Sequence, residues 1–308
     1  MDLLCVDETH NALSLAGPAV AAVVTDAAPV DAALLKALPN LKAVVKLGRN
    51  YSNVDAQAVR GRGLVFASVP RKGPNCVAEL AMTLILALSK DLLIMHESVI
   101  SGAYRLRGLK PELTSQRKHA FQWMAHARLH EVRGKTVGII GMGEIGFELA
   151  LRAHVMGMRI TYHKRTPLSP ELEQRTHAEY RELNTLLAES DYVYVTVPLT
   201  PETDKLIGRE QLAMMKPSAY LVNTCRGGVV DEDALIEALA TCQIAGAGLD
   251  VFTYEPLPFD SPLCDLDNVI LMPHIGGGTG SARLGELAVG LEEVQRILAG
   301  EPPAIDLR

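Results

Sequence analysis

The sequence predicts an α/β protein with a doubly wound parallel sheet, preceded by a smaller α/β region. Three observations support this class. From Lys135 onward, short apolar runs rich in Val and Ile alternate with longer amphipathic runs, which is the pattern of parallel strands with helices on both faces. The segment before Asn75 repeats this alternation on a smaller scale. A glycine-rich turn also joins the first apolar run after Lys135 to the amphipathic run behind it, as between a strand and a helix.

The strands expected after Lys135 are short and apolar: Thr136–Ile140, Arg159–Tyr162, Tyr192–Val197, Ala219–Val222, Ile244–Leu249 and Val269–Leu271. The helices expected between them are Phe147–Met156, Arg181–Glu189, Arg209–Met215 and Asp231–Ala240. Asp231 precedes Leu235 and Leu239, which lie at helical spacing, so we expect Asp231 to cap its helix by accepting a hydrogen bond from the first turn.

The region before the glycine-rich turn contains three expected strands, Ala21–Thr25, Leu41–Lys46 and Leu64–Ala67, and two expected helices, Val30–Leu38 and Asp55–Arg60. A long helix should then run from about Asn75 to Ile100. Because it is apolar on most faces, we expect it to be buried between domains. The polar segment Arg107–His119 reads as a loop.

The composition describes an ordinary globular protein. The chain has 308 residues, 48% hydrophobic and 21% charged, which suits about two domains. Its net charge of −6 argues against broad nucleic-acid binding. The five cysteines are scattered without a CxxC pair, so we expect a reducing compartment and no metal site. The start lacks the basic residues of a secretion signal, and the longest apolar stretch, Leu80–Leu88, is too short to cross a membrane. We therefore expect a cytoplasmic protein.

The turn Gly141-Met142-Gly143-Glu144-Ile145-Gly146 matches the GxGxxG pattern of dinucleotide sites. Its first glycine permits the tight turn, its second lets backbone amides approach a pyrophosphate, and its third lets the helix pack on the strand. A glycine turn can also be purely structural. The strand before this one and the helix after it favour nucleotide binding.

The end of the second strand indicates which dinucleotide is bound. NAD enzymes usually place Asp or Glu there, to bond the ribose 2′-hydroxyl. This chain instead reads His163-Lys164-Arg165-Thr166. A 2′-phosphate is bound well by Lys and Arg and repelled by an acid, so we predict that NADP is preferred and that NAD is the weaker cofactor. The alternative is a solvated basic loop.

Three residues just beyond strand ends suggest the chemistry. Arg226 follows the strand Ala219–Val222, and at that edge its planar fork can hold a carboxylate and polarise a carbonyl. Glu255 and His274 follow the next two strands. A carboxylate beside the imidazole favours its protonated form, which can supply a proton to an alkoxide after hydride addition to a ketone. Alone, each residue is more often structural.

These residues and several others resemble the D-isomer-specific 2-hydroxyacid dehydrogenase family. The similarity covers most of the chain and lies in the segments Gly48–Asp55, Ala78–Leu80, Gly141–Gly146, Pro198–Thr203, Thr224–Leu235, Gly248–Pro256, Pro273–Gly277 and Leu298–Pro303. Separate motifs in the right order are more specific than the glycine turn alone. The basic turn is similar to that of the NADPH-using glyoxylate and hydroxypyruvate reductases.

The resemblance implies a Rossmann-type nucleotide domain over residues 75–276 and a smaller flavodoxin-like substrate domain from residues 1–74 and 277–308. It implies a homodimer, Arg226 as the substrate-binding residue, His274 as acid and base with Glu255 as its partner, and amides of Leu47-Gly48-Arg49 around the substrate carboxylate. Cofactor contacts are expected at Gly141, Gly143, Glu144, Ile145, Gly146, His163, Lys164, Arg165, Thr166, Val197, Pro198, Thr203, Thr224, Cys225, Arg226, Asp250, His274 and Gly276, with Asp250 near the nicotinamide.

We therefore expect an NADP-preferring reductase that converts small 2-oxo acids into D-2-hydroxy acids. One alternative is a nucleotide-sensing binding protein of the corepressor kind. Another is a dehydrogenase of a different small anion, such as phosphite, formate or 3-phosphoglycerate. The segment before Gly48 is short for the family, so the first strand of the substrate domain is expected to be absent or rearranged.

Overall fold

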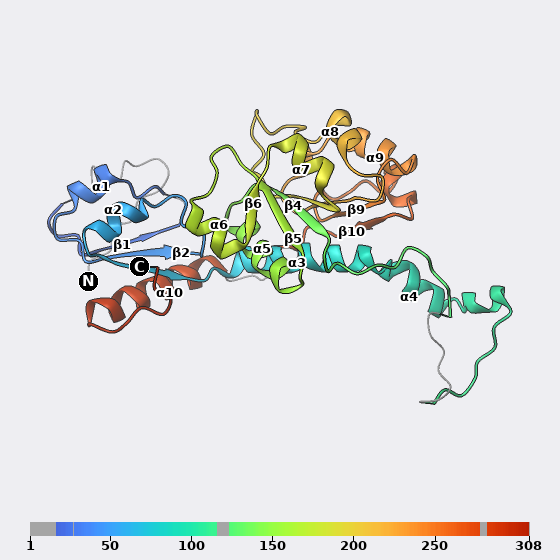
Figure 1. Cartoon of the computed structure of the whole chain (residues 1–308), viewed down its shortest axis with the longest axis horizontal. Coiled ribbons are helices and arrows are strands. Elements are labelled where there is room, and N and C mark those ends of the chain that lie inside the picture. Colours follow the sequence, from blue (N-terminus) through green and yellow to red (C-terminus); the bar gives the residue numbers. More distant parts are fainter. Residues whose placement is uncertain (1–16, 27, 116–122, 278–281, 308) are drawn as a thin grey trace. The chain divides into compact units, whose positions relative to one another are not determined.

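The computed structural model describes residues 17–26, 28–115, 123–277 and 282–307. The chain divides into two compact units (Figure 1). The smaller unit comprises Met1–Cys76, Leu168–Leu172 and Gly277–Arg308, and the larger comprises Val77–Pro167 and Glu173–Gly276. The short segment Leu168–Leu172, which was expected in the nucleotide domain, groups with the smaller unit.

The larger unit is built on a parallel sheet with the order β10-β9-β8-β7-β4-β5-β6, in which all neighbouring strands run parallel. The strands are β4 (Thr136–Ile140), β5 (Arg159–His163), β6 (Ala178–Tyr180), β7 (Tyr192–Val195), β8 (Tyr220–Asn223), β9 (Gly246–Leu249) and β10 (Val269–Leu271). The order runs outward from β4 in both directions, so the doubly wound prediction is confirmed. The switch point between β4 and β7 is where such sheets bind ligands.

The helices between these strands are α5 (Glu144–Val155), α6 (Pro170–Thr176), α7 (Leu183–Glu189), α8 (Arg209–Met214) and α9 (Glu232–Ala240). The short 3-10 turns η3 (Gly227–Val229) and η4 (Pro262–Asp265) also lie between strands, whereas η2 (Ala103–Arg107) precedes β4. Asp231 caps α9 as predicted, because its carboxylate accepts from the Ala234 amide. Leu235 and Leu239 of α9 are buried in a core with Val193 and Leu221 of the sheet. Packing of this kind fixes the strand ends from which the site residues emerge.

The long helix expected from Asn75 to Ile100 is two helices, so this prediction was wrong. α3 (Lys72–Ser89) ends before Asp91, whose φ of 45° is left-handed, and α4 (Leu92–Ile100) begins after it. The Asp91 carboxylate is bound by His126 and by Arg128, which hold the break. α4 contains no buried residue, so the expected burial fails for this half of the segment.

The sequence patterns also missed α6 and the edge strand β6. β6 is three residues long, and it pairs in parallel with β5 through Ile160 and Ala178. Its middle residue, Glu179, is exposed. A strand this short and polar carries too little periodicity to be recognised.

The smaller unit holds a parallel sheet with the order β1-β2-β3. Its elements are β1 (Ala22–Thr25), α1 (Ala32–Ala37), β2 (Ala43–Leu47), α2 (Ala56–Gly61), β3 (Val65–Val69) and α10 (Ala282–Leu298). Asp31 and Asp55 cap α1 and α2 by accepting from amides three residues on. Val294 and Ile297 of α10 pack against β2 and β3. The expectation about the first strand concerns the segment before Gly48, of which residues 1–16 and 27 lie outside the described residues.

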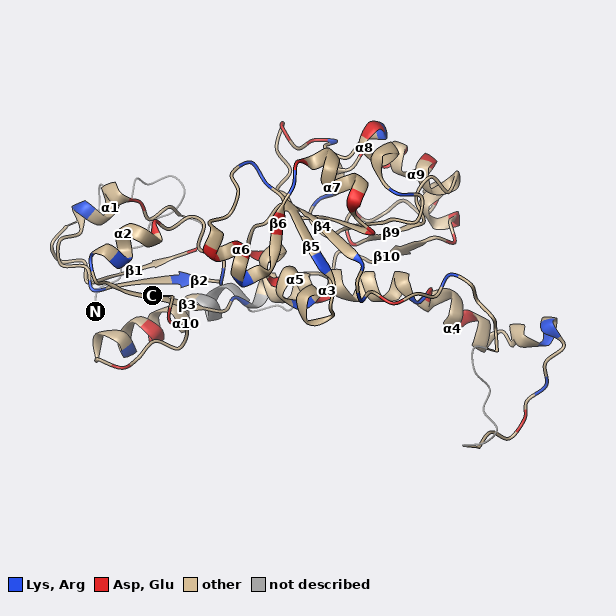
Figure 2. Ribbon diagram, in the orientation of Figure 1, with Lys and Arg blue, Asp and Glu red and all other residues tan. Residues whose placement is uncertain are grey.

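Acidic and basic residues are interspersed along the elements of both units (Figure 2). Within the described ranges, no helix combines the length and the apolar character that a membrane span requires.

Candidate active site

The expected catalytic residues leave neighbouring strands at the same edge of the larger sheet. Arg226 follows β8, Asp250 follows β9 directly, and His274 follows β10. Because β8, β9 and β10 are adjacent and parallel, their carboxyl ends meet at one edge. Glu255 lies in the loop between β9 and β10 and reaches back to His274. The structure thus brings together Arg226, Glu255 and His274, which the sequence separates by many residues.

His274 and Glu255 form a hydrogen-bonded pair. The His274 Nδ1 donates to Glu255 Oε2 at 2.5 Å, and Glu255 Oε1 accepts from the Phe252 amide at 3.1 Å. Burial alone would raise the pKa of Glu255, but the bonds from His274 and Phe252, with the charges of His274 and Arg226, outweigh it and lower the pKa below its ordinary value. With Nδ1 engaged, Nε2 is the His274 nitrogen that can face a substrate.

Asp250 holds the loop that carries His274. Its fully buried carboxylate accepts from the Ile275 amide through Oδ1 and from the Gly276 amide through Oδ2, both at 2.8 Å. His274 itself has a left-handed φ of 55°. A Cβ at position 276 would lie 2.9 Å from Asp250 Oδ2, so only glycine fits there without displacing the carboxylate. The residue expected beside the nicotinamide therefore has both oxygens engaged by the loop of the proton donor.

Arg226 is exposed, and its Nη1 donates to the Cys225 carbonyl at 2.6 Å. Within the described part of the chain, no carboxylate forms an ion pair with it, although its charge helps to lower the pKa of Glu255. Its guanidinium thus retains donors for an anionic ligand. Asn223, at the end of β8, bonds through its side chain to the backbone of Cys225 and Arg226 and so holds the turn between them and the strand. Asn223 was not identified from the sequence. The available signal was an amide residue closing an apolar strand just before the turn.

The glycine-rich turn has the geometry that a pyrophosphate requires. Gly141 has a φ of 100°, and a Cβ there would lie 2.4 Å from the Thr196 carbonyl oxygen. A Cβ on Gly146 would lie 2.5 Å from the Gly141 oxygen, which shows how closely α5 packs on the turn. A Cβ on Gly143 would meet no atom within 4 Å, so open space lies beside the N-terminus of α5. Two glycines serve tight packing and the middle one leaves room for a ligand, as dinucleotide binding requires.

The basic turn after β5 is partly fixed by its surroundings. His163 Nδ1 bonds to the Arg181 carbonyl at 3.0 Å, and its ring lies near that of Tyr180. Burial lowers the pKa of Lys164, while Arg165 is exposed. Thr166, the last residue of the turn, is exposed as well.

The remaining expected cofactor contacts flank the glycine turn or lie beside Arg226. Val197 is partly buried against the core of the larger unit, and a Cβ on Gly141 would meet its side chain at 2.7 Å. Thr203 Oγ1 donates to the Pro198 carbonyl at 2.6 Å and closes that loop. The Thr224 hydroxyl bonds to Tyr194 inside the core at 2.8 Å. Cys225 is buried, and burial raises the pKa of its thiol. Thr224 and Cys225 therefore offer a ligand mainly their backbone.

The expected carboxylate loop lies in the smaller unit, after β2. Gly48 has a φ of 95°, and its amide donates to the Val69 carbonyl at 2.7 Å. This bond continues the ladder between β2 and β3, so the Gly48 amide is already engaged. A substrate carboxylate near Leu47-Gly48-Arg49 would need a neighbouring amide or the breaking of this bond.

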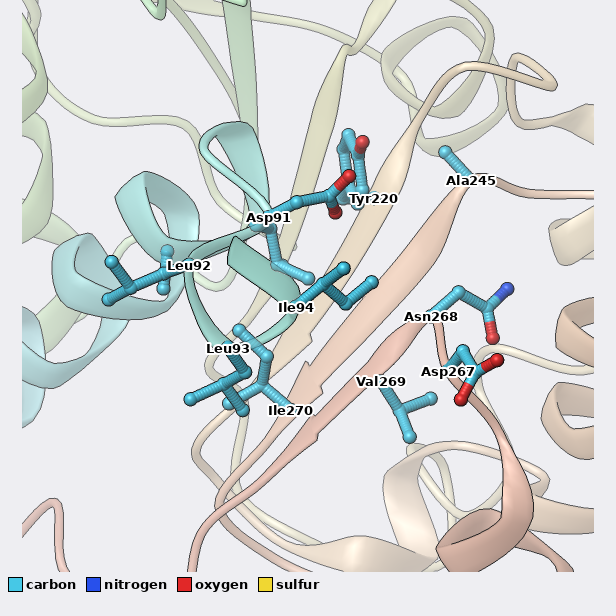
Figure 3. Close-up of a pocket in the computed structure, with 12 residues that line it drawn as sticks. Asp91, Leu92, Leu93, Ile94, Tyr220, Ala245, Asp267, Asn268, Val269 and Ile270 are labelled. Carbon is cyan, nitrogen blue, oxygen red and sulfur yellow. The ribbon is translucent and has the colours of Figure 1, made fainter. Parts of the chain in front are cut away.

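A pocket of the larger unit lies at the opposite edge of its sheet (Figure 3). Tyr220 is the first residue of β8, and Asn268 immediately precedes β10, so these residues mark the amino ends of the strands. The other lining residues come from the end of α3, the start of α4 and neighbouring strand ends: Ala87, Leu88, Asp91, Leu92, Leu93, Ile94, Ala245, Asp267, Val269 and Ile270. None of the expected catalytic residues belongs to this pocket.

Comparison with known proteins agrees with this geometry. The family model described as "D-isomer specific 2-hydroxyacid dehydrogenase, NAD binding domain" matches residues 83–276. The chain is 40% identical over 292 residues to glyoxylate/hydroxypyruvate reductase B of Pectobacterium carotovorum subsp. carotovorum (strain PC1), covering 94% of this chain and 86% of the relative. It is also 40% identical to a glyoxylate reductase of Thermococcus gammatolerans over 89% of this chain and 78% of that one.

Among solved structures, a glyoxylate reductase from Paecilomyes thermophila is 30% identical with a TM-score of 0.59, over 94% of this chain and 84% of the other. The apo form of Rhodotorula graminis D-mandelate dehydrogenase is 29% identical with a TM-score of 0.61, over 94% and 83% of the two chains. By the family model and by identity over most of its length, the chain belongs to the D-isomer specific 2-hydroxyacid dehydrogenase family.

Proposed function

We propose that this protein reduces small 2-oxo acids to D-2-hydroxy acids with NADPH. The observation that carries the proposal is the His274–Glu255 pair at the strand edge from which Arg226 also emerges. The His274 imidazole, bonded to the Glu255 carboxylate, can act as a proton donor. The Arg226 guanidinium has no ion pair among the described residues and can bind the substrate carboxylate. The curated relatives that are named glyoxylate reductase and glyoxylate/hydroxypyruvate reductase support glyoxylate and hydroxypyruvate as first substrates to examine.

In the proposed reaction the nicotinamide, when bound, supplies the hydride to the carbonyl carbon. Arg226 holds the substrate carboxylate and polarises the carbonyl. The His274 Nε2 protonates the carbonyl oxygen as negative charge develops on it, and Glu255 stabilises the charged imidazole before that transfer. Asp250 keeps His274 in its left-handed backbone conformation through the two amides that follow it.

The proposed preference for NADPH rests on the turn after β5. Lys164 and Arg165 supply positive charge, and no carboxylate stands within His163–Thr166 to repel a 2′-phosphate. Partial burial of Lys164 lowers its pKa, and a bound phosphate would favour its charged form. Open space beside Gly143 and the N-terminus of α5 suit the pyrophosphate of either dinucleotide.

The smaller unit is proposed to be the substrate domain, with Leu47-Gly48-Arg49 near the substrate carboxylate. The Gly48 amide is already bonded to the Val69 carbonyl in the sheet. We therefore propose that the Arg49 side chain, and not only its backbone amide, binds the substrate carboxylate. We place the domain boundaries at residues 74/75 and 276/277.

A second copy of the chain is proposed to cover α4. Leu92, Leu93, Val99 and Ile100 expose 53%, 53%, 57% and 65% of their surface, although α4 is apolar. Burying aliphatic side chains of this size contributes about 1.5–3 kcal/mol each. Sedimentation velocity should therefore find a dimer in the wild type and a monomer in Leu93→Glu with Ile100→Glu. A wild-type monomer at micromolar concentration would contradict this proposal.

The function is tested by following NADPH absorbance with a panel of 2-oxo acids that includes glyoxylate, hydroxypyruvate and pyruvate. We expect turnover of at least one, and a higher kcat/KM with NADPH than with NADH. Parallel reactions with NADP and phosphite, formate or 3-phosphoglycerate complete the panel. Oxidation of those anions without 2-oxo acid reduction, or tight NADPH binding without any turnover, would overturn the proposal.

A further inference from the structure

The buried side chain of Asn223 holds the turn that carries Arg226. Asn223 is the last residue of β8 and is 1% exposed. Its Oδ1 accepts from the Cys225 amide at 3.1 Å and from the Cys225 thiol at 3.0 Å. Its Nδ2 donates to the Arg226 carbonyl at 3.0 Å. One amide group therefore satisfies the polar atoms on both sides of the Cys225–Arg226 peptide.

This bracing requires a neutral amide. The two ends of the group perform opposite tasks, because one accepts from an N–H and the other donates to a carbonyl. A carboxylate at position 223 could accept from Cys225 but would repel the Arg226 carbonyl oxygen. An apolar residue would leave the buried Cys225 N–H without its partner, which is costly away from water, and would leave the Arg226 carbonyl only the 3.3 Å bond from the Val229 amide.

The same turn is tied to the loop of the proton donor. The Asn223 carbonyl accepts from the Asp250 amide at 2.9 Å. Gly227 lies so close to Phe252 that a Cβ on it would be 1.9 Å from the Phe252 carbonyl carbon. Asn223 therefore lies where the turn after β8 contacts the loop after β9. Its side chain fixes the backbone conformation of the turn that carries Arg226.

Among the described residues, the hydrogen-bond partner of the Arg226 side chain is the preceding residue, Cys225. The Arg226 Nη1 bonds to the Cys225 carbonyl, and the Asn223 side chain holds the peptides on either side of the one to which that carbonyl belongs. The direction of the guanidinium consequently depends on the conformation of the turn, since no ion pair among the described residues corrects it.

From this geometry we infer that Asn223 is a positioning residue, which sets the direction in which the Arg226 guanidinium meets the substrate carboxylate. The inference rests on the proposed reduction of 2-oxo acids. It adds a residue whose side chain acts through the turn that carries Cys225 and Arg226 and forms no hydrogen bond with His274.

The test compares Asn223→Asp and Asn223→Ala with the wild type. We expect KM for the 2-oxo acid to rise about 10- to 100-fold, the loss typical of a misplaced hydrogen bond to a charged group. The dissociation constant of NADPH should change much less than KM, and kcat should fall by a smaller factor than KM rises, since Arg226 also polarises the carbonyl. The control is Asn268→Asp, because that amide donates to the Leu239 carbonyl at 3.1 Å at the opposite edge of the sheet. Its KM should remain that of the wild type.

A double-mutant cycle separates positioning from a general loss of structure. In the Arg226→Ala background, Asn223→Ala should raise KM little further, because the group that it positions is already gone. Additive effects would overturn the inference, as would an unchanged KM in both Asn223 variants.

A crystal structure of Asn223→Asp, which preserves side-chain volume, gives a readout that does not depend on activity. We expect the Arg226 carbonyl and the guanidinium to be displaced from their wild-type positions. An unmoved turn would overturn the inference even if the wild type reduced no 2-oxo acid, whereas wild-type inactivity alone would count only against the proposed function.

Discussion

Replacing Glu255 with Gln removes the negative charge beside His274 while keeping an oxygen that can accept from Nδ1. The bond that loses its charge is 2.5 Å long, and the His274 and Glu255 side chains are 42% and 33% exposed. A hydrogen bond to a charged group contributes about 1.5–3 kcal/mol, and solvent screening of this half-exposed pair favours the lower end. A loss of about 1.5 kcal/mol corresponds to about a tenfold lower rate of proton donation.

The lowered pKa of Glu255 also predicts the direction in which the reduction rate changes with pH. The pKa of Glu255 is lowered, so its carboxylate stays charged to lower pH than an ordinary Glu, and the pair is lost only as pH falls through that lowered value. In the wild type, reduction should therefore persist into the acid range and decline only when Glu255 becomes protonated. In Glu255→Gln this decline at the acid end should be absent, because no carboxylate remains there to be protonated.

The assay is the single-turnover rate of NADPH oxidation with excess 2-oxo acid across pH, which reports chemistry and not product release. Glu232→Gln is the matched control, because Glu232 Oε2 accepts from the Thr253 amide in the same loop at 2.9 Å without contacting His274. An unchanged rate and an unchanged decline at the acid end in Glu255→Gln would contradict this role of the Glu255 charge. Equal losses in both variants would show that the loop, and not the charge, was disturbed.

Two further predictions concern the cofactor and the packing of the site. Lys164→Ala should lower kcat/KM for NADPH about 10-fold or more while leaving that for NADH unchanged, since only the 2′-phosphate needs the ammonium group; equal losses with both cofactors would contradict this. Gly227→Ala should lower the free energy of unfolding by about 1–3 kcal/mol, because its Cβ would lie 1.9 Å from backbone carbon of Phe252. Thermal unfolding measures this against Gly61→Ala, where a Cβ would meet nothing within 4 Å; equal melting temperatures would contradict it.

Local patterns predicted the sheet well because its strands are buried on both faces. Each of β4, β7 and β8 is buried along its whole length and mostly apolar, as is typical of a parallel sheet. The ends were less predictable. β7 stops at Val195, two residues before the expected end, because the chain must turn there to pass over Gly141. The break at Asp91 depends on partners at His126 and Arg128, which no local periodicity reveals.

The site followed from chain order combined with topology. Arg226 and His274 come after strands that a doubly wound sheet places close together, so their convergence could be expected from sequence. The contacts of Asp250 and Asn223 could not, since each binds backbone amides or carbonyls whose positions depend on the folded turns. The left-handed φ of His274 is equally invisible in a sequence, because it is imposed by the loop that Asp250 holds.

The most direct test of the account measures reduction of glyoxylate or hydroxypyruvate by NADPH in the wild type and in His274→Asn, together with NADPH affinity. A general acid contributes typically 10²–10⁴-fold, so we predict that turnover falls by at least about 100-fold in the variant while NADPH binds as before. Wild-type turnover that survives in His274→Asn would contradict the central claim that this imidazole delivers the proton.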